Sequence, residues 1–278
     1  MAASLQEQLQ ALADAFPGTA GVAAQNLTTG EAVALNDAES FPTASMIKIM
    51  VLFELVRQCA RGQAQLWERM TLRQADKTRG SGLLLDMDEG LNLTLRDLAV
   101  MMMSISDNTA TNMLVDRLGK HAINEACREA GMHHTELRNK IDFDLIDQSH
   151  DNLAVTTPRD YRVFLAALRR GELLPEPYVE QMLGIMRIQK YMSWTFRRLL
   201  PYDPYAAEFG NAQETWIASK TGGLSGVRCE AGLFHTARAE WALCVCTKGF
   251  TKTEPGSDDP GSRFLSEASR LVFQAWGG

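Results

Sequence analysis

The sequence lacks the features that mark several specialised classes of protein. No uninterrupted apolar stretch approaches the roughly 18 to 20 residues that a membrane-spanning helix requires. Acidic residues outnumber basic ones, 34 to 28, so the net charge of −6 provides no basic surface for nucleic acid. Internal repeats and low-complexity segments are absent as well. These absences predict a globular protein with no membrane span and no nucleic-acid partner.

Cysteine and histidine are also scarce, with five of each. The histidines form no H-E-x-x-H or Cys-His ligand pattern, which argues against a metal site. The cysteines are odd in number and irregular in spacing, and four of the five lie in apolar segments. This pattern predicts buried free thiols, as in a reducing compartment. The cysteines are Cys59, Cys127, Cys229, Cys244 and Cys246.

The first residues, MAASLQEQLQALADAF, have neither a basic n-region nor a continuous apolar core. They predict an amphipathic helix rather than a signal peptide, which on its face indicates a cytoplasmic chain. A chain whose leader had been removed would begin in the same way, so the location in the cell stays open.

The chain has 278 residues, 45% of them hydrophobic, which is enough for one large domain or two modest ones. Strand-like segments occur near both ends, each accompanied by an amphipathic helix, and the middle is mostly helical. This order predicts an α/β protein in which both chain ends build one α/β domain around an inserted all-α domain. We place the α/β domain at 1–42 plus 196–278 and the all-α domain at 43–195.

The apolar segment TASMIKIMVLFELV, residues 43–56, has a lysine where a buried helix should begin. Pro42 and Thr43 are helix-start signals, so Lys48 falls in the first turn. A cation there opposes the positive end of the helix dipole, and burying an ammonium is costly. Both penalties disappear if Lys48 is neutral, and a neutral amine is a base. Ser45 lies one turn before Lys48 on the same helix face, where that base can activate its hydroxyl.

Three short motifs occur once each in the chain. They are S-x-x-K at Ser45–Lys48, S-D-N at Ser106–Asn108 and K-T-G at Lys220–Gly222. Their expected contexts are a helix start, a loop between two helices, and a strand. S-x-x-K alone is common, whereas S-D-N and K-T-G are much rarer, so the occurrence of all three in this order is a specific signal.

With these motifs the chain resembles the penicillin-recognising serine hydrolases, most closely the class A β-lactamases. The T-T-P helix start at 156–158, the order of elements and the C-terminal helix agree with that family over nearly the whole chain. The resemblance implies an α/β sandwich whose antiparallel sheet is built from both chain ends. It also implies a serine hydrolase with no cofactor or metal, acting on a small β-lactam or D-Ala-type amide. Such relatives usually act outside the cytoplasm.

The reaction implied by the resemblance is acyl transfer through the motif residues. Ser45 would attack the substrate carbonyl with Lys48 as its base. Ser106 would pass a proton to the departing nitrogen, held between Lys48 and Lys220. The Lys220 ammonium would also help to keep Lys48 neutral.

The same resemblance assigns the binding roles. Asn108 would hydrogen-bond the acylamide group of the substrate, and Lys220 and Thr221 would bind its carboxylate, with Arg228 as a helper. The N–H of Gly223 would join the helix N-terminus in stabilising the oxyanion.

Each of these residues also has a purely structural interpretation. Lys48 could extend its ammonium from a helix end to water, and Asp107 or Asn108 could simply cap the next helix. The K-T-G segment could be an ordinary edge strand. The three motifs together favour the functional interpretation, except for Arg228, which is more simply an exposed strand residue.

One class A motif is missing. Class A enzymes release the acyl group with a glutamate in E-x-x-L-N, shortly before the T-T-P helix, and this chain has no such motif. The spacing in the family leads to the neighbourhood of Ile141. Asp142, Asp144 and Glu136 are the nearby carboxylates that could replace the glutamate, although each is more simply a solvated surface group.

Three functions therefore stay open, in order of preference. The first is a β-lactam hydrolase of class A type with an altered deacylation base. The second is a related serine D-Ala-type peptidase, amidase or esterase that β-lactams merely acylate. The third is a non-catalytic penicillin-binding module that traps acyl groups. The oligomeric state is not readable from the sequence.

Overall fold

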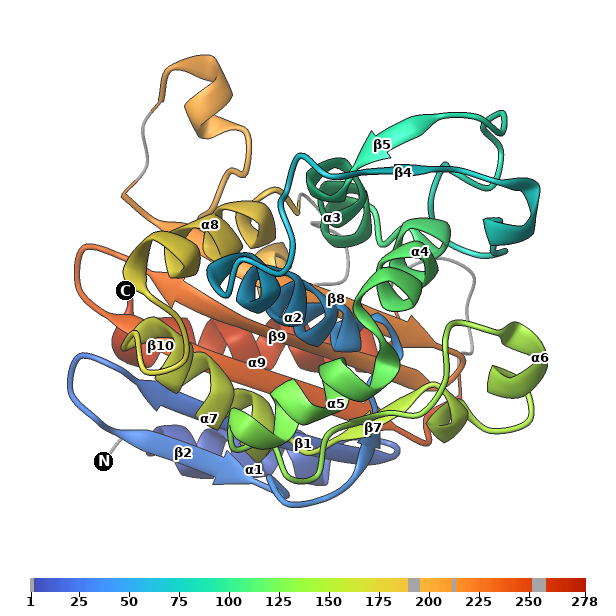
Figure 1. Ribbon diagram of the computed structural model, residues 1–278. Helices are drawn as coiled ribbons and strands as arrows, with labels where there is room; N and C mark the ends of the chain where they lie inside the picture. The colour runs from blue at the N-terminus through green and yellow to red at the C-terminus, as the bar shows by residue number, and fades with distance from the viewer. Residues whose placement is uncertain (1–2, 190–195, 212–213, 252–258) are drawn as a thin grey trace.

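A five-stranded antiparallel sheet lies at the centre of the computed structural model, with helices on both faces (Figure 1). The structure describes residues 3–189, 196–211, 214–251 and 259–278. The strand order is β2-β1-β10-β9-β8, so strands from the two ends of the chain are neighbours. This confirms the predicted α/β sandwich. The strands are β1 Thr19–Asn26, β2 Ala32–Leu35, β8 Trp216–Leu224, β9 Val227–His235 and β10 Glu240–Lys248.

Two hydrophobic cores fill the two sides of this sheet. On one side, α1 and α9 pack against side chains such as Ile217 and Trp241. On the other side, the helices between β2 and β8 pack against side chains such as Ala218 and Ala231 (Figure 1). The helices are α1 Leu5–Asp14, α2 Lys48–Ala60, α3 Leu95–Ser104, α4 Asn108–Leu118, α5 Lys120–Glu129, α6 Phe143–Ile146, α7 Pro158–Arg169, α8 Glu176–Arg187 and α9 Pro260–Trp276.

Short elements connect the helices. Two small antiparallel pairings, β4 with β5 and β3 with β7 and β6, lie outside the central sheet. The short strands are β3 Phe41–Pro42, β4 Arg69–Thr71, β5 Asn92–Thr94, β6 Glu136–Leu137 and β7 Ala154–Thr156. The 3-10 turns are η1 Ala44–Ile47, η2 Gln74–Asp76, η3 His150–Asn152, η4 Phe196–Leu199 and η5 Ala206–Phe209.

Local capping explains where the predicted helices begin. Ser4 and Glu7 form a capping box at α1, as expected for an amphipathic helix at this end. Thr157 caps α7 through the N–H of Asp160, and Pro158 occupies the first helical position. The T-T-P helix start is therefore confirmed.

Side-chain direction alternates along β8, which decides what faces the helical layer. Ala218 belongs to the core of the helical layer and Ile217 to the core beneath α9. Lys220 and Gly222 therefore share the helical face with Ala218, whereas Ser219 and Thr221 face the other side.

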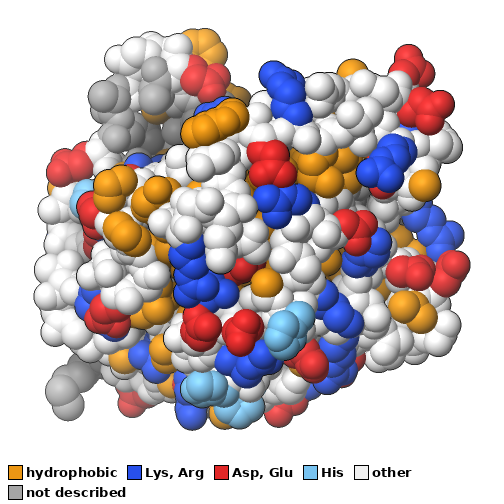
Figure 2. Space-filling model, in the orientation of Figure 1, with side chains coloured by type: hydrophobic (Ala, Val, Ile, Leu, Met, Phe, Trp, Pro, Cys, Tyr) orange, Lys and Arg blue, Asp and Glu red, His pale blue; other side chains and the backbone are white. Residues whose placement is uncertain are grey.

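The proposed division at residue 195 falls in 190–195, which lie outside the described residues, and it stays a prediction. The chain ends do contribute the sheet, and the segment between them is mostly helical. Within the described residues, no helix is both long and apolar enough to cross a bilayer. Acidic and basic side chains are intermixed over the face drawn in Figure 2.

All five cysteines are buried and none is in a disulfide. The predicted state of the thiols is therefore confirmed.

Candidate active site

The site begins at the turn that precedes α2. Ser45 lies in η1 and is partly exposed, whereas Lys48, the first residue of α2, is fully buried. The Tyr161 hydroxyl donates to the carbonyl of Met46 at 3.0 Å and so holds this turn against α7. The lysine is therefore in the first turn, as the sequence predicts, and its side chain is inside the protein.

The Lys48 amine joins S-x-x-K to S-D-N. Its Nζ lies 2.7 Å from the Ser106 carbonyl oxygen, 3.0 Å from Ser106 Oγ and 2.8 Å from Asn108 Oδ1. Ser106 and Asn108 are themselves buried. The structure thus brings the first two motifs into direct contact.

Asp107 explains how the S-D-N loop is held. One of its carboxylate oxygens caps α4 through the Ala110 N–H at 2.9 Å. The other accepts from the N–H groups of Leu83 and Leu84 at 2.7 and 3.0 Å. Ser106 has a φ of +61°, a conformation unfavourable for a non-glycine residue. The capping role thus belongs to Asp107, which leaves its two neighbours turned toward Lys48.

The K-T-G strand lies directly against the serine turn. A Cβ on Gly222 would be 2.5 Å from the Thr43 carbonyl oxygen and 2.9 Å from the Met46 nitrogen. Only glycine allows β8 to approach η1 this closely. The third motif is therefore next to Ser45.

The outer edge of β8 offers a backbone donor. The Thr221 N–H points away from β9, toward Gln189 Oε1 at 3.4 Å. Because N–H directions alternate along a strand, the N–H of Gly223 points the same way. Gly223 is exposed. It can therefore donate to a ligand at this edge.

Burial disfavours the charged forms of both lysines. Burial, with the Lys220 charge as a second cause, holds the pKa of Lys48 well below its usual range, and Asp107 opposes this. Burial lowers the pKa of Lys220 to about 7, and Glu230 opposes this. Neutral Lys48 beside Ser45 and Ser106 can accept a proton.

Arg228 is not brought to this site. It opposes Gly223 in the β8–β9 ladder, and its side chain packs against Gly261 of α9, on the sheet face opposite Lys220. Its guanidinium pairs with Asp259 at 2.5 Å and donates to the carbonyl of Leu224 at 2.7 Å. Its predicted role as a helper has no support from this geometry.

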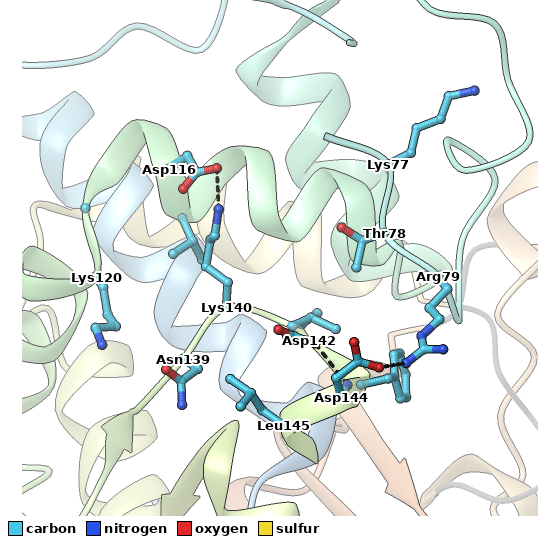
Figure 3. A pocket seen from close by; sticks show the side chains of 14 residues that line it. Lys77, Thr78, Arg79, Asp116, Lys120, Asn139, Lys140, Asp142, Asp144 and Leu145 are labelled. Atoms are coloured by element: carbon cyan, nitrogen blue, oxygen red, sulfur yellow. Dashed lines mark hydrogen bonds and ion pairs between the residues drawn. The ribbon is translucent and has the colours of Figure 1, made fainter. Parts of the chain in front are cut away.

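The candidate deacylation carboxylates are exposed and bonded elsewhere. Glu136 pairs with Arg138 at 3.3 Å, and Asp144 pairs with Arg79 at 2.5 Å. Asp142 caps α6 through the N–H of Asp144 at 2.9 Å. Asp142 and Asp144 line a cavity of about 670 Å³ between α4 and α6 (Figure 3). Neither carboxylate bonds to the Lys48 cluster.

Ile141 is held by a residue that the sequence reasoning missed. The Asn112 side chain accepts from the Ile141 N–H and donates to its carbonyl, both at 2.9 Å. Asn112 lies one turn after Asn108 on α4, and that i, i+4 spacing was the available signal. Ile141 is itself buried in the core of the helical layer. An apolar side chain is therefore buried near the position to which the class A spacing leads.

Comparison with known proteins agrees with this geometry. A family model described as "Beta-lactamase enzyme family" matches residues 4–276. The chain belongs to the β-lactamase enzyme family. This family member is 28% identical to a β-lactamase of Streptomyces fradiae over 98% of this chain and 86% of that protein. It is a hydrolase of this family, and the family implies a small-molecule β-lactam substrate.

Solved structures extend the similarity to three dimensions. The β-lactamase of Sphaerobacter thermophilus has 29% identity and a TM-score of 0.82, covering 96% of each chain. The structure of PBP-A has 28% identity and a TM-score of 0.82, covering 98% of this chain and 95% of that one. An ancestral class A β-lactamase, at 24% identity and a TM-score of 0.83, shows the fold alone.

Proposed function

We propose that this β-lactamase family member opens the β-lactam amide through an acyl-enzyme on Ser45. The observation that carries the proposal is the buried amine of Lys48, which lies one helical turn from Ser45. This amine bonds to Ser106 and Asn108, and the charge of Lys220 lowers its pKa. Such an amine serves as the base that a serine hydroxyl needs.

Acylation moves one proton in two stages. Ser45 Oγ bonds to the carbonyl carbon while its proton passes to Lys48 Nζ. The N–H of Gly223 and the N–H groups of η1 stabilise the oxyanion. The amide C–N bond then breaks, and the proton reaches the departing nitrogen from Lys48 through the Ser106 hydroxyl, 3.0 Å from Nζ.

Substrate binding uses the groups around this centre. Lys220 as an ammonium binds the substrate carboxylate together with the Thr221 hydroxyl, which lies 3.4 Å from Lys220 Nζ although the Thr221 side chain starts on the opposite face of β8. Asn108 accepts from Lys48 with its oxygen and donates one N–H to the Arg79 carbonyl at 3.0 Å. Its second N–H is available for the acylamide carbonyl of the substrate.

Deacylation, the hydrolysis of the acyl-enzyme, is the step that we expect to be slow. Ile141 cannot activate water, and the nearby carboxylates are bonded elsewhere. We therefore expect an altered deacylation base and a long-lived acyl-enzyme. The same observation favours a second candidate, a D-Ala-type peptidase, amidase or esterase that β-lactams acylate. A PBP-A variant with a similar fold, at 28% identity, was solved as an acyl-enzyme complex with penicillin G.

A chromogenic cephalosporin distinguishes these functions. Steady turnover supports the β-lactamase. A stoichiometric burst, together with hydrolysis of a D-Ala peptide or an ester, supports the second candidate. A burst without turnover of any such substrate indicates an acyl-trapping module. Intact-protein mass spectrometry with peptide mapping must place the adduct on Ser45, and Ser45→Ala must abolish it. An adduct on another residue would refute the proposal.

A further inference from the structure

A group of polar side chains is buried beneath β8 and has no part in the reaction above. Glu230 and Arg197 are both fully buried, and their charged groups lie 3.3 Å apart. The Ser219 hydroxyl donates to Glu230 at 2.6 Å, and Arg197 donates to Ser219 Oγ at 2.7 Å. The N–H of Phe196 donates to the second Glu230 oxygen at 2.8 Å. The carboxylate is thus bonded at both of its oxygens.

Stability alone does not account for these buried charges. Removing an ion pair from water costs several kcal/mol per ion, and well-packed apolar residues of similar volume often stabilise a protein as well or better. Arg197 on η4 and Glu230 on β9 both bond to Ser219 and so connect η4 to β8. Apolar side chains could also make this contact. Their position relative to the site gives a further reason for the charges.

Glu230 lies directly behind the K-T-G strand. It opposes Thr221 in the β8–β9 ladder, and it bonds to Ser219. Ser219 and Thr221 are the two neighbours of Lys220. The Glu230 carboxylate therefore lies on the sheet face opposite Lys220, and only the backbone of the sheet separates the two faces.

Gln189 holds the same segment of β8 through hydrogen bonds at the outer edge of the sheet. Its amide nitrogen donates to the Ser219 carbonyl at 3.3 Å, and its oxygen accepts from the Thr221 hydroxyl at 3.1 Å and from the Thr221 N–H at 3.4 Å. The backbone on both sides of Lys220 is therefore held by a buried network that ends in Glu230.

We propose that Glu230 is a positioning residue that keeps Lys220 charged for the carboxylate of the substrate. This rests on the proposed function, in which Lys220 binds that carboxylate. Arg197 neutralises the buried charge of Glu230 and fixes the orientation of its carboxylate. Because Glu230 pairs with Thr221 in the β8–β9 ladder, the negative charge lies next to the strand that carries Lys220.

The charges around Lys220 agree with this role. Burial pushes its pKa down to about 7, and among the neighbouring charges Glu230 raises it most, whereas Arg197 lowers it. The charged or titratable groups near the pair of lysines are Lys48 on α2, Asp107 before α4, Cys229 and Glu230 on β9, and Arg197 on η4. Without the Glu230 charge, Lys220 loses its proton at a lower pH.

The test compares a penicillin with its neutral methyl ester as acylating agents of wild type and Glu230→Gln. The acylation rate is followed by mass spectrometry from about pH 5 to about pH 9, a range that spans the Lys220 titration. For the penicillin, the variant should lose rate at a lower pH than wild type, by roughly fivefold or more near pH 7. For the ester, the two proteins should differ little. Glu230→Asp, which keeps the charge, should restore most of the penicillin rate.

Two further variants keep the result interpretable. Glu54→Gln is a matched control, because Glu54 is also buried and paired with Arg57, at 2.6 Å on α2. It should lower stability without moving the pH profile. If Glu230→Gln does not fold, the double variant Glu230→Gln with Arg197→Met removes both charges of the buried pair. It should shift the pH profile in the same direction but less, because Arg197 lowers the Lys220 pKa by less than Glu230 raises it.

The outcomes separate this inference from the proposed function. A folded Glu230 variant with the wild-type pH profile overturns the inference, and so does an equal loss of rate for penicillin and ester. If wild type forms no adduct on Ser45, the proposed function fails instead.

Discussion

Replacing Gly222 with alanine tests whether the close contact between β8 and the serine turn carries the reaction. The added Cβ would lie 2.5 Å from the Thr43 carbonyl oxygen, 2.6 Å from Cys229 Sγ and 2.9 Å from the Met46 nitrogen. The sulfur can move, but the other two atoms belong to the backbone of the turn. Normal contact requires β8 and η1 to separate by about 1 Å, and such overpacking costs about 1–3 kcal/mol of stability.

The same separation should have a larger effect on acylation than on folding. A shift of about 1 Å in reacting groups lowers rates by about 100-fold. The assay is the acylation rate of folded protein by a chromogenic cephalosporin, with stability measured by urea unfolding. Gly277→Ala, just after α9, is the control: its Cβ would overlap the Trp241 ring in the core beneath α9, on the sheet face opposite the serine turn, so stability should fall without loss of acylation. Wild-type acylation by folded Gly222→Ala would refute the reasoning.

Three other perturbations have defined outcomes. Lys48→Arg keeps a cation but supplies no neutral amine, so acylation should fall by about 100-fold or more, and near-normal acylation would remove Lys48 from the base role. Ile141→Glu should shorten the lifetime of the acyl-enzyme by about tenfold or more if a carboxylate there reaches the water, as followed by the decay of the mass-spectrometric adduct; an unchanged lifetime would contradict this. The pKa of Lys220 is about 7 when folded and near 10.5 when unfolded, so between these values the unfolded state binds more protons and the free energy of unfolding rises with pH. Urea titrations from about pH 7 to about pH 8.5 should show a shallower rise for Lys220→Met, and equal slopes would rule out the buried-lysine explanation.

The sequence predicted the parts of the site that depend on local spacing. Ser45 and Lys48 are one turn apart, so their common position follows from helix geometry alone. The separate motifs could be joined only through the family resemblance, because the contacts of Lys48 with Ser106 and Asn108 span 58 and 60 residues. No local pattern encodes such a contact.

The position of Arg228 follows from a signal in the sequence. Leu224 opposes Val227 across the two-residue turn Ser225-Gly226, a short connection that fixes the register of the hairpin. Counting back from that turn places Arg228 opposite Gly223, on the face away from Lys220. The alternation of side chains along the strand therefore indicates that the Arg228 side chain starts on the face opposite Lys220. The role of Glu230 was not predictable in this way, because it depends on how η4 packs against the sheet.

The two halves of the proposed reaction depend on features of very different energetic cost. The acylation half requires two buried lysines and a serine with positive φ, each of which is unfavourable by itself. It also requires a glycine contact without room for a methyl group. Near the position where the class A spacing would place a deacylation base, the chain instead has Ile141, a residue that is inexpensive to bury. A chain organised in this way should acylate faster than it releases, so the adduct would be the main species under saturating β-lactam. The ratio of the two rates then depends on what can activate water next to Ser45, which is the step where β-lactamases and penicillin-binding proteins diverge.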